Sequence, residues 1–189
     1  MKKIIIISVV LIACLLGTLF FLRHSGQSKG INKSPEVMMI ETFYRNYLTD
    51  RGYHVGNLFS KSYSDLSELE SETCKEKAKG DMCGFGADGD VFLCSQEYEL
   101  YLDFGLYHFN ITEPSPGVVE VRLNVYPSLK DEQEQQVYTR RIRYMMIKEK
   151  GNWVIDDFRC LPNEPSDMGS AREEMQKTIQ FYNAPTGLK

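Results

Sequence analysis

Four cysteines are the side chains with the clearest chemistry in this chain: Cys74, Cys83, Cys94 and Cys160. Zinc sites usually take cysteines from C-x-x-C pairs, and this spacing does not occur here. An even number of cysteines after the first 24 residues instead predicts two disulfides and an oxidising compartment. Three connectivities are open, of which we favour Cys74–Cys83, closing a local loop, with Cys94–Cys160 joining two distant strands.

A short acidic motif could offer oxygen ligands to calcium. Asp88-Gly89-Asp90, with Asp81 upstream, lacks the full pattern of an EF-hand loop and its closing Glu. We therefore interpret the motif as turn chemistry, in which an aspartate side chain bonds its own backbone. We expect no metal site and no cofactor.

A second acidic pair, Asp156-Asp157, lies at the end of an expected strand. If side chains alternate along this strand, one carboxylate points inward and needs a partner. Arg140, Arg141 or Arg143 on the neighbouring strand could supply the partner. We expect such an ion pair to have a structural role.

Helical patterns come first among the elements that must position these groups. Ser34-Pro35 predicts an N-cap followed by proline in the first turn, and apolar residues then recur at helical spacing until Arg51-Gly52 ends the helix. Residues 57–79 have weaker periodicity and predict one or two helices with a polar outer face. A glycine-rich loop over 80–90 separates them from the rest.

The remainder of the chain predicts mostly strands. Residues 91–95 are a short strand candidate, and alternation predicts longer strands over 100–111, 119–125, 137–148 and 153–158. The apolar parity switches within 100–111, so we predict a β-bulge near Gly105.

Two connections and a last helix complete the pattern. Residues 128–136 predict a polar loop, and Gly151-Asn152 predicts a hairpin turn. A short helix over 170–182 begins with the capping box Ser170-x-x-Glu173. Helices followed by an antiparallel meander predict an α+β domain, with N-terminal helices packed on the sheet.

The N-terminal segment, residues 1–24, predicts attachment to a membrane. Lys2 and Lys3 precede an uncharged, mainly apolar run over 4–22, which is about long enough to span a bilayer core of roughly 30 Å. We favour an uncleaved signal anchor, a single transmembrane helix. The alternatives are a lipoprotein signal with lipidation at Cys14, in Leu11-Ile12-Ala13-Cys14, and a cleaved signal peptide.

A polar tether over 25–33 would join this anchor to one domain over 34–189. The chain after residue 24 carries 19 basic and 26 acidic side chains, a formal charge of −7. An acidic surface argues against nucleic acid and against broad docking on anionic lipid. It suits a basic protein partner.

Several short motifs carry a family resemblance: Tyr44-Arg45-Asn46-Tyr47-Leu48, Leu58-Phe59-Ser60-Lys61, Gly89-Asp90-Val91-Phe92 with Ser95-Gln96, and the hairpin with Tyr144-Met145-Met146-Ile147-Lys148, Gly151-Asn152 and Trp153-Val154-Ile155-Asp156-Asp157. Together they resemble the nuclear transport factor 2-like superfamily, in particular a bacterial branch of exported or lipid-anchored proteins without established activity. The resemblance covers about 34–182 and implies a strongly curved antiparallel sheet that wraps the N-terminal helices into a cone. The four cysteines depart from it.

The superfamily includes isomerases and dehydratases that use Asp, Tyr or His inside the cone. Here Asp103, Tyr101, Tyr107 and His108 could supply a general base and an oxyanion donor. In the expected strand, however, Asp103 and His108 alternate with apolar residues, so their side chains should face water. We therefore expect no catalytic residue. We interpret the tyrosines as aromatic side chains of the core or of a pocket rim, with the hydroxyl group in contact with water.

The expected function is a membrane-anchored, extracytoplasmic binding or interaction module without catalytic activity. A pocket lined by Tyr44, Tyr47, Tyr107 and Tyr144 would hold a small molecule or an envelope protein. One alternative is an immunity protein that blocks an antibacterial toxin in the periplasm, and another is a small hydrolase or isomerase. We expect the domain to face the periplasm from the bacterial inner membrane.

Overall fold

The computed structural model describes residues 33–50, 53–79, 81–99, 104–161 and 169–184. It divides the chain into two units, Met1–Lys33 and Ser34–Lys189, and all helices and strands described below belong to the second. The expected anchor over 1–24, with Cys14, lies outside the described residues. Within the described ranges, no helix combines the length and apolar character needed to cross a membrane.

Two helices open the domain. Helix α2 (Pro35–Thr49) starts at Ser34, whose Oγ accepts the backbone N–H of Val37 at 3.3 Å, as the sequence predicts. Helix α3 (Lys61–Lys77) starts at Ser60, whose Oγ accepts the N–H of Tyr63 at 3.0 Å. The second helical region is therefore one continuous helix, which is one of the two forms expected.

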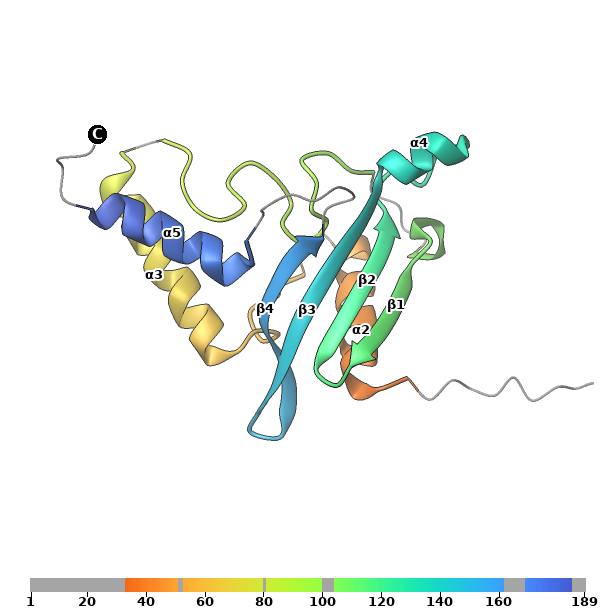
Figure 1. Ribbon diagram of the computed structural model, residues 1–189, viewed down its shortest axis with the longest axis horizontal. Coiled ribbons are helices and arrows are strands. Elements are labelled where there is room, and N and C mark those ends of the chain that lie inside the picture. The colour runs from red at the N-terminus through yellow and green to blue at the C-terminus, as the bar shows by residue number, and fades with distance from the viewer. Residues whose placement is uncertain (1–32, 51–52, 80, 100–103, 162–168, 185–189) are drawn as a thin grey trace, which may run out of the picture. The chain divides into compact units, whose positions relative to one another are not determined.

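Four strands form an antiparallel sheet in chain order: β1 (Asn110–Ser115), β2 (Val118–Asn124), β3 (Thr139–Glu149) and β4 (Asn152–Leu161). The inner face carries buried Val121, Ile142 and Tyr144, which pack in one core with side chains of α2 such as Phe43. Figure 1 shows α2 behind the sheet. The outer face carries the alternate, mostly polar side chains. The α+β class is thus confirmed.

Helix α5 (Ala171–Asn183) packs beside α3, next to β4 (Figure 1). Its capping box is present, because the Ser170 Oγ accepts the Glu173 N–H and the Glu173 carboxylate accepts the Ser170 N–H. The edge of β4 is also covered: Ser60 donates its N–H to the Ile155 carbonyl at 2.8 Å, and the Ile155 N–H donates to Leu58 at 2.7 Å. This places the start of α3 against the sheet.

Several local predictions were wrong. A short 3₁₀ helix, η1 (Phe104–Tyr107), occupies the position of the bulge expected near Gly105. A short helix, α4 (Glu132–Val137), replaces part of the expected loop over 128–136, because the Asp131 side chain caps its first turn. The hairpin turn consists of Lys150 and Gly151, both with positive φ, and Asn152 already belongs to β4.

The register of the sheet is irregular in two other places. One irregularity lies between Thr112 and Ser115 of β1. The other lies in β4, where Met145 pairs with Asp157 but Met146 pairs with Ile155. Asp156 is therefore an extra residue in β4, which is the arrangement of a β-bulge.

Candidate functional site

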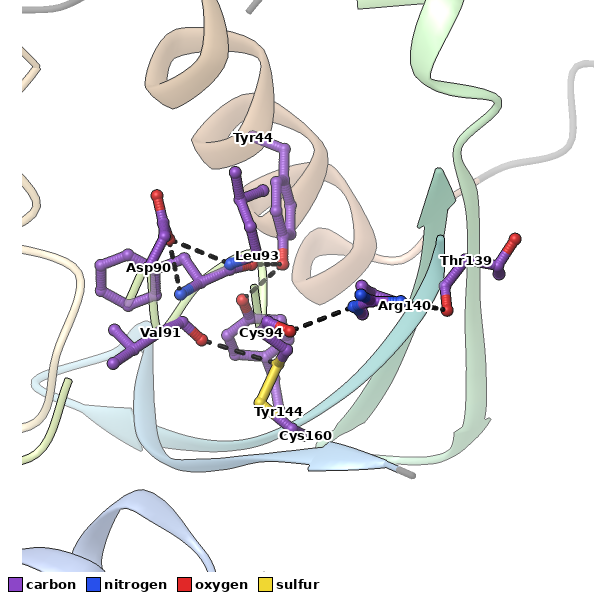
Figure 2. The surroundings of a disulfide bond; sticks show 10 residues. Tyr44, Asp90, Val91, Leu93, Cys94, Thr139, Arg140, Tyr144 and Cys160 are labelled. Atoms are coloured by element: carbon purple, nitrogen blue, oxygen red, sulfur yellow. Dashed lines mark hydrogen bonds between the residues drawn. A yellow bond between two sulfur atoms is a disulfide. The ribbon is translucent and has the colours of Figure 1, made fainter. Parts of the chain in front are cut away.

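Two disulfides fasten the loop over 81–99, which follows α3. Cys74–Cys83 joins the last turn of α3 to this loop, and Cys94–Cys160 joins the loop to the end of β4. These are the pairs that the sequence favours. Figure 2 shows that Arg140 of β3 also reaches the loop, donating from Nε to the Cys94 carbonyl at 3.1 Å. The loop is thus held against the sheet by both a covalent bond and a hydrogen bond.

Asp90 is the polar centre of the 81–99 loop. Its Oδ1 accepts the N–H groups of Phe92 (2.9 Å) and Leu93 (3.0 Å), of which Figure 2 labels Leu93, and its Oδ2 accepts the Tyr47 hydroxyl at 2.7 Å. These bonds close a turn, so residues 91–95 do not form the expected strand. Burial and the hydrogen bond to Asp90 raise the pKa of Tyr47. The other two aspartates of the motif, Asp81 and Asp88, are exposed.

Metal ligands do not gather in the part of the chain that the structure describes. There, no group of three or more His, Cys, Asp or Glu side chains is placed to hold an ion. The Asp90 carboxylate accepts at least three donors, and its bonds to the Phe92 and Leu93 N–H groups are those of the turn that the motif indicates.

Three of the four tyrosines expected to line a pocket lie fully inside the core: Tyr44, Tyr107 and Tyr144. Tyr107 donates its hydroxyl to the Glu99 carbonyl at 2.8 Å, and the hydroxyls of Tyr44 and Tyr144 bond each other. Tyr47 is half-buried beside Asp90. Hydrogen bonds from Tyr44, Tyr47 and Tyr107 therefore help to hold the 81–99 loop in place.

A hollow of about 500 Å³ lies between α3, the segment over 55–59 and the 81–99 loop, and Met175 of α5 also lines it. Phe59 and Tyr63 stack at its base, with ring centroids 4.4 Å apart. Its apolar floor combines side chains from four segments of the chain: Phe59, Tyr63, Phe85, Val91, Phe92 and Met175. We call this space the α3–α5 hollow.

One face of α3 supplies the polar rim of the α3–α5 hollow. Its rim residues recur at helical spacing: Ser64, Ser67, Glu68, Ser71, Glu72 and Lys75. An apolar floor with a few polar groups is the usual composition of a small-molecule site. With two exposed carboxylates and one lysine, Lys75, the rim has a net negative charge, and this charge beside aromatic rings favours a cation.

Glu70 connects the rim to the floor. It is only 5% exposed, and its Oε1 accepts the Phe85 N–H at 2.9 Å. This bond and the Cys74–Cys83 disulfide both join α3 to the 81–99 loop. The two walls of the hollow are therefore held together.

The catalytic candidates do not assemble in the described structure. Tyr101 and Asp103 lie outside the described residues, and His108 is exposed. Among the described residues that line the α3–α5 hollow there is no histidine, so its serine hydroxyls have no imidazole base there.

We predicted that Arg140, Arg141 or Arg143 would pair with one carboxylate of Asp156-Asp157, and this prediction was wrong. Asp156 Oδ1 accepts the Ser60 hydroxyl at 2.6 Å and Arg172 Nη1 at 3.2 Å. Asp157 Oδ1 accepts the N–H groups of Phe158 (2.8 Å) and Arg172 (3.1 Å). The bulge at Asp156 turns these carboxylates toward the starts of α3 and α5, where unpaired backbone N–H groups lie.

The arginines of β3 have other partners. Arg140 bonds the Cys94 carbonyl, and Arg143 donates from Nε to Glu120 at 2.7 Å. Arg141 lies 3.7 Å from the same carboxylate. In the register of the sheet, Arg143 lies directly opposite Glu120 of β2, which accounts for this pairing.

Sequence reasoning missed the α3–α5 hollow. The only signal was the polar face of 57–79, because the floor is assembled from separate segments that two disulfides bring together. No protein-family model, curated protein or solved structure matches this chain. The geometry of the site is therefore the basis for a functional proposal.

Proposed function

We propose that this protein is a membrane-anchored, extracytoplasmic binding module whose α3–α5 hollow holds a ligand with an apolar body and a positive charge. The observation that carries the proposal is the aromatic floor under a rim with two exposed carboxylates, Glu68 and Glu72. The floor would bury the apolar body, while the rim would attract the charge.

The location is supported by two features. The two disulfides suggest an oxidising compartment outside the cytosol. The apolar run over 4–22 supports attachment to a membrane, through a transmembrane helix or through a lipid at Cys14. A position on the periplasmic side of a bacterial inner membrane completes this proposal.

Membership of the nuclear transport factor 2-like superfamily, with its cone-shaped sheet, is also proposed here. Its support is the order of elements, two helices followed by an antiparallel meander of four strands. The bulge at Asp156 also supports it, since bulges bend sheets. The superfamily carries many functions, so membership alone does not identify a ligand.

The proposal can be tested with two probes that share an aromatic body and differ in charge. Benzyltrimethylammonium is the cation, and toluenesulfonate is the anion. We expect the full chain in neutral-detergent micelles to bind the cation, with NMR shift changes at α3 and at residues 85–92. Glu68→Gln and Glu72→Gln should each weaken binding by up to about fivefold, the range of an exposed charge pair.

Glu76→Gln provides the matched control, because Glu76 is an exposed acid of α3 that does not line the hollow. It should leave the affinity for the cation nearly unchanged. Equal binding of both probes, or equal effects of all three substitutions, would contradict a charge-selective site.

A second candidate function is favoured by the exposure of the rim. A basic side chain of a protein could occupy the same hollow, as in an immunity protein that blocks a toxin. A pull-down from envelope extract should then capture a partner with the wild-type chain and lose it with the Glu68→Gln/Glu72→Gln variant. Retention by that double variant would remove this candidate.

The hydrolase or isomerase alternative has weaker support. Its candidate Asp103 lies outside the described residues, and the Asp157 carboxylate is occupied by two backbone N–H groups. If Asp103→Asn and Asp157→Asn leave any measured turnover unchanged, this alternative is excluded.

A further inference from the structure

The outer face of the sheet carries four arginines in two adjacent rows. Arg122 of β2 lies directly opposite Arg141 of β3, and Arg143 of β3 lies directly opposite Arg159 of β4. Like charges at directly opposite positions destabilise an antiparallel pair. This arrangement is therefore unfavourable unless anions neutralise it.

One acidic side chain neutralises only part of this charge. Glu120 binds Arg143 and lies near Arg141. Within the described ranges, no residue forms an ion pair or side-chain hydrogen bond with Arg122 or Arg159. The face thus has a local excess of positive charge, although the chain after residue 24 has a formal charge of −7.

A second hollow, of about 220 Å³, lies beside Arg122 where β2 ends and β3 begins. Its polar lining comes from β1 to β3, from α4 and from a residue between η1 and β1, and includes His108, Asn110, Arg122, Asn124, Gln135 and Thr139. Among the described residues that line it there is no acidic side chain. We call this space the Arg122 hollow.

The wall of the Arg122 hollow is fixed by hydrogen bonds. Gln135 Nε2 donates to the Leu129 carbonyl at 2.6 Å, and Thr139 Oγ1 donates to the Gln135 carbonyl at 2.8 Å. These bonds hold α4 over the end of the sheet. The guanidinium therefore borders a defined space instead of a flat surface.

We propose that the Arg122 hollow binds the phosphate group of an anionic ligand, with Arg122 as the main contact. A guanidinium presents a planar fork of N–H donors that matches two phosphate oxygens. His108 and Asn110 border the same space and offer further polar contacts. A bound phosphate also offsets the repulsion between Arg122 and Arg141. This site is separate from the α3–α5 hollow and does not depend on the function proposed for it.

The test is an NMR titration of the full chain in neutral-detergent micelles. Sodium phosphate is compared with sodium chloride at equal ionic strength. We expect saturable, phosphate-specific shifts at residues 108–110, 122–124 and 135–139. Arg122→Gln should weaken phosphate binding about tenfold or more, the effect of losing a charged hydrogen bond.

Arg159→Gln is the matched control, because Arg159 is an exposed arginine of the same face outside the hollow. It should retain nearly wild-type binding. Arg122→Lys keeps the charge but loses the fork, so it should weaken binding by several-fold. Absence of phosphate-specific shifts in the wild type, or equal weakening by Arg122→Gln and Arg159→Gln, would overturn the proposal.

A second arm separates the two sources of a phosphate group. Micelles are prepared with and without phosphatidylglycerol. Shifts at the same residues that require this lipid and disappear in Arg122→Gln would identify a lipid headgroup as the ligand. Shifts with inorganic phosphate alone would identify a soluble phosphorylated compound.

Discussion

The hydroxyl oxygens of Tyr44 in α2 and Tyr144 in β3 lie 2.8 Å apart inside the core. Tyr44 also donates to the Phe92 carbonyl at 2.7 Å. Because a hydroxyl has one proton, Tyr144 must be the donor to Tyr44. A directed chain of hydrogen bonds therefore connects the sheet, the first helix and the 81–99 loop.

This direction predicts unequal effects for two similar substitutions. Tyr44→Phe leaves both the Tyr144 hydroxyl and the Phe92 carbonyl without this partner, and should lower the free energy of unfolding by roughly 2–3 kcal/mol. Tyr144→Phe removes only the donor to the Tyr44 hydroxyl and should lower the free energy of unfolding by about 1 kcal/mol. Urea unfolding of both variants measures the difference. Equal losses would show that the chain has no such direction.

The same pair predicts loss of stability in alkali. Burial raises the pKa of Tyr44 and of Tyr144 above the ordinary value of about 10. Above about pH 10 the unfolded chain releases these protons while the folded chain keeps them, so stability is complete below that pH and falls as the pH rises. Unfolding free energies from about pH 8 to 11 should show this fall, with a flatter curve for the Tyr44→Phe/Tyr144→Phe variant.

The two disulfides should contribute unequally to stability. Cys94–Cys160 closes a loop with a sequence separation of 66, and Cys74–Cys83 one of 9. By loop entropy alone, removing them should cost about 4 and about 2.5 kcal/mol, respectively. Urea unfolding of the Cys94→Ala/Cys160→Ala and Cys74→Ala/Cys83→Ala variants tests this order. A larger loss of stability on removing Cys74–Cys83 would mean that native-state strain or residual structure in the unfolded chain outweighs the effect of loop length.

Ser60 and Ser62 offer a matched comparison at the start of α3. Ser60 is fully buried, caps the helix and bonds Asp156. Ser60→Ala should therefore cost about 2 kcal/mol, the sum of a cap and a hydrogen bond. Ser62 is exposed and does not cap the helix, but its hydroxyl donates to the same Asp156 carboxylate at 3.2 Å, so Ser62→Ala should lower the free energy of unfolding by about 0.5 kcal/mol. Thermal unfolding of the two variants should separate them clearly, and similar midpoints would argue against this role of Ser60.

Features set by neighbouring residues could be predicted from the sequence. Ser34-Pro35 and the Ser170–Glu173 capping box locate two helix starts, because their bonds span only three residues. The alternation of Ile142, Tyr144 and Met146 predicts a strand with one buried face, since only one register keeps all three inside.

Features set by distant partners could not be predicted. Residues 91–95 have the composition of a strand, but the Asp90 carboxylate and the Cys94–Cys160 bond hold them in turns. The bulge at Asp156 is stabilised by Ser60 and Arg172, which lie far away in sequence. The α3–α5 hollow depends on both kinds of contact, so its floor had no sequence signal.

Gly86 and Gly151 test how tightly the floor of that hollow is built. Their φ angles are nearly equal, 86° and 85°, but a Cβ at Gly86 would lie 2.4 Å from Val91 Cγ1, whereas Gly151 has no atom within 4 Å. Gly151→Ala should cost about 1 kcal/mol for the left-handed backbone. Gly86→Ala should cost a further 1–3 kcal/mol or so, from the clash.

Adding Val91→Ala to Gly86→Ala removes the clashing methyl group, so it should recover part of the free energy of unfolding. Urea unfolding of the single and double variants measures this coupling. Because Phe85 and Val91 both line the hollow, Gly86→Ala should also weaken binding of benzyltrimethylammonium, while Gly151→Ala should not. Equal destabilisation by the two glycine substitutions would show that the 81–99 loop relaxes freely, and a rigid floor would then no longer explain selectivity at this site.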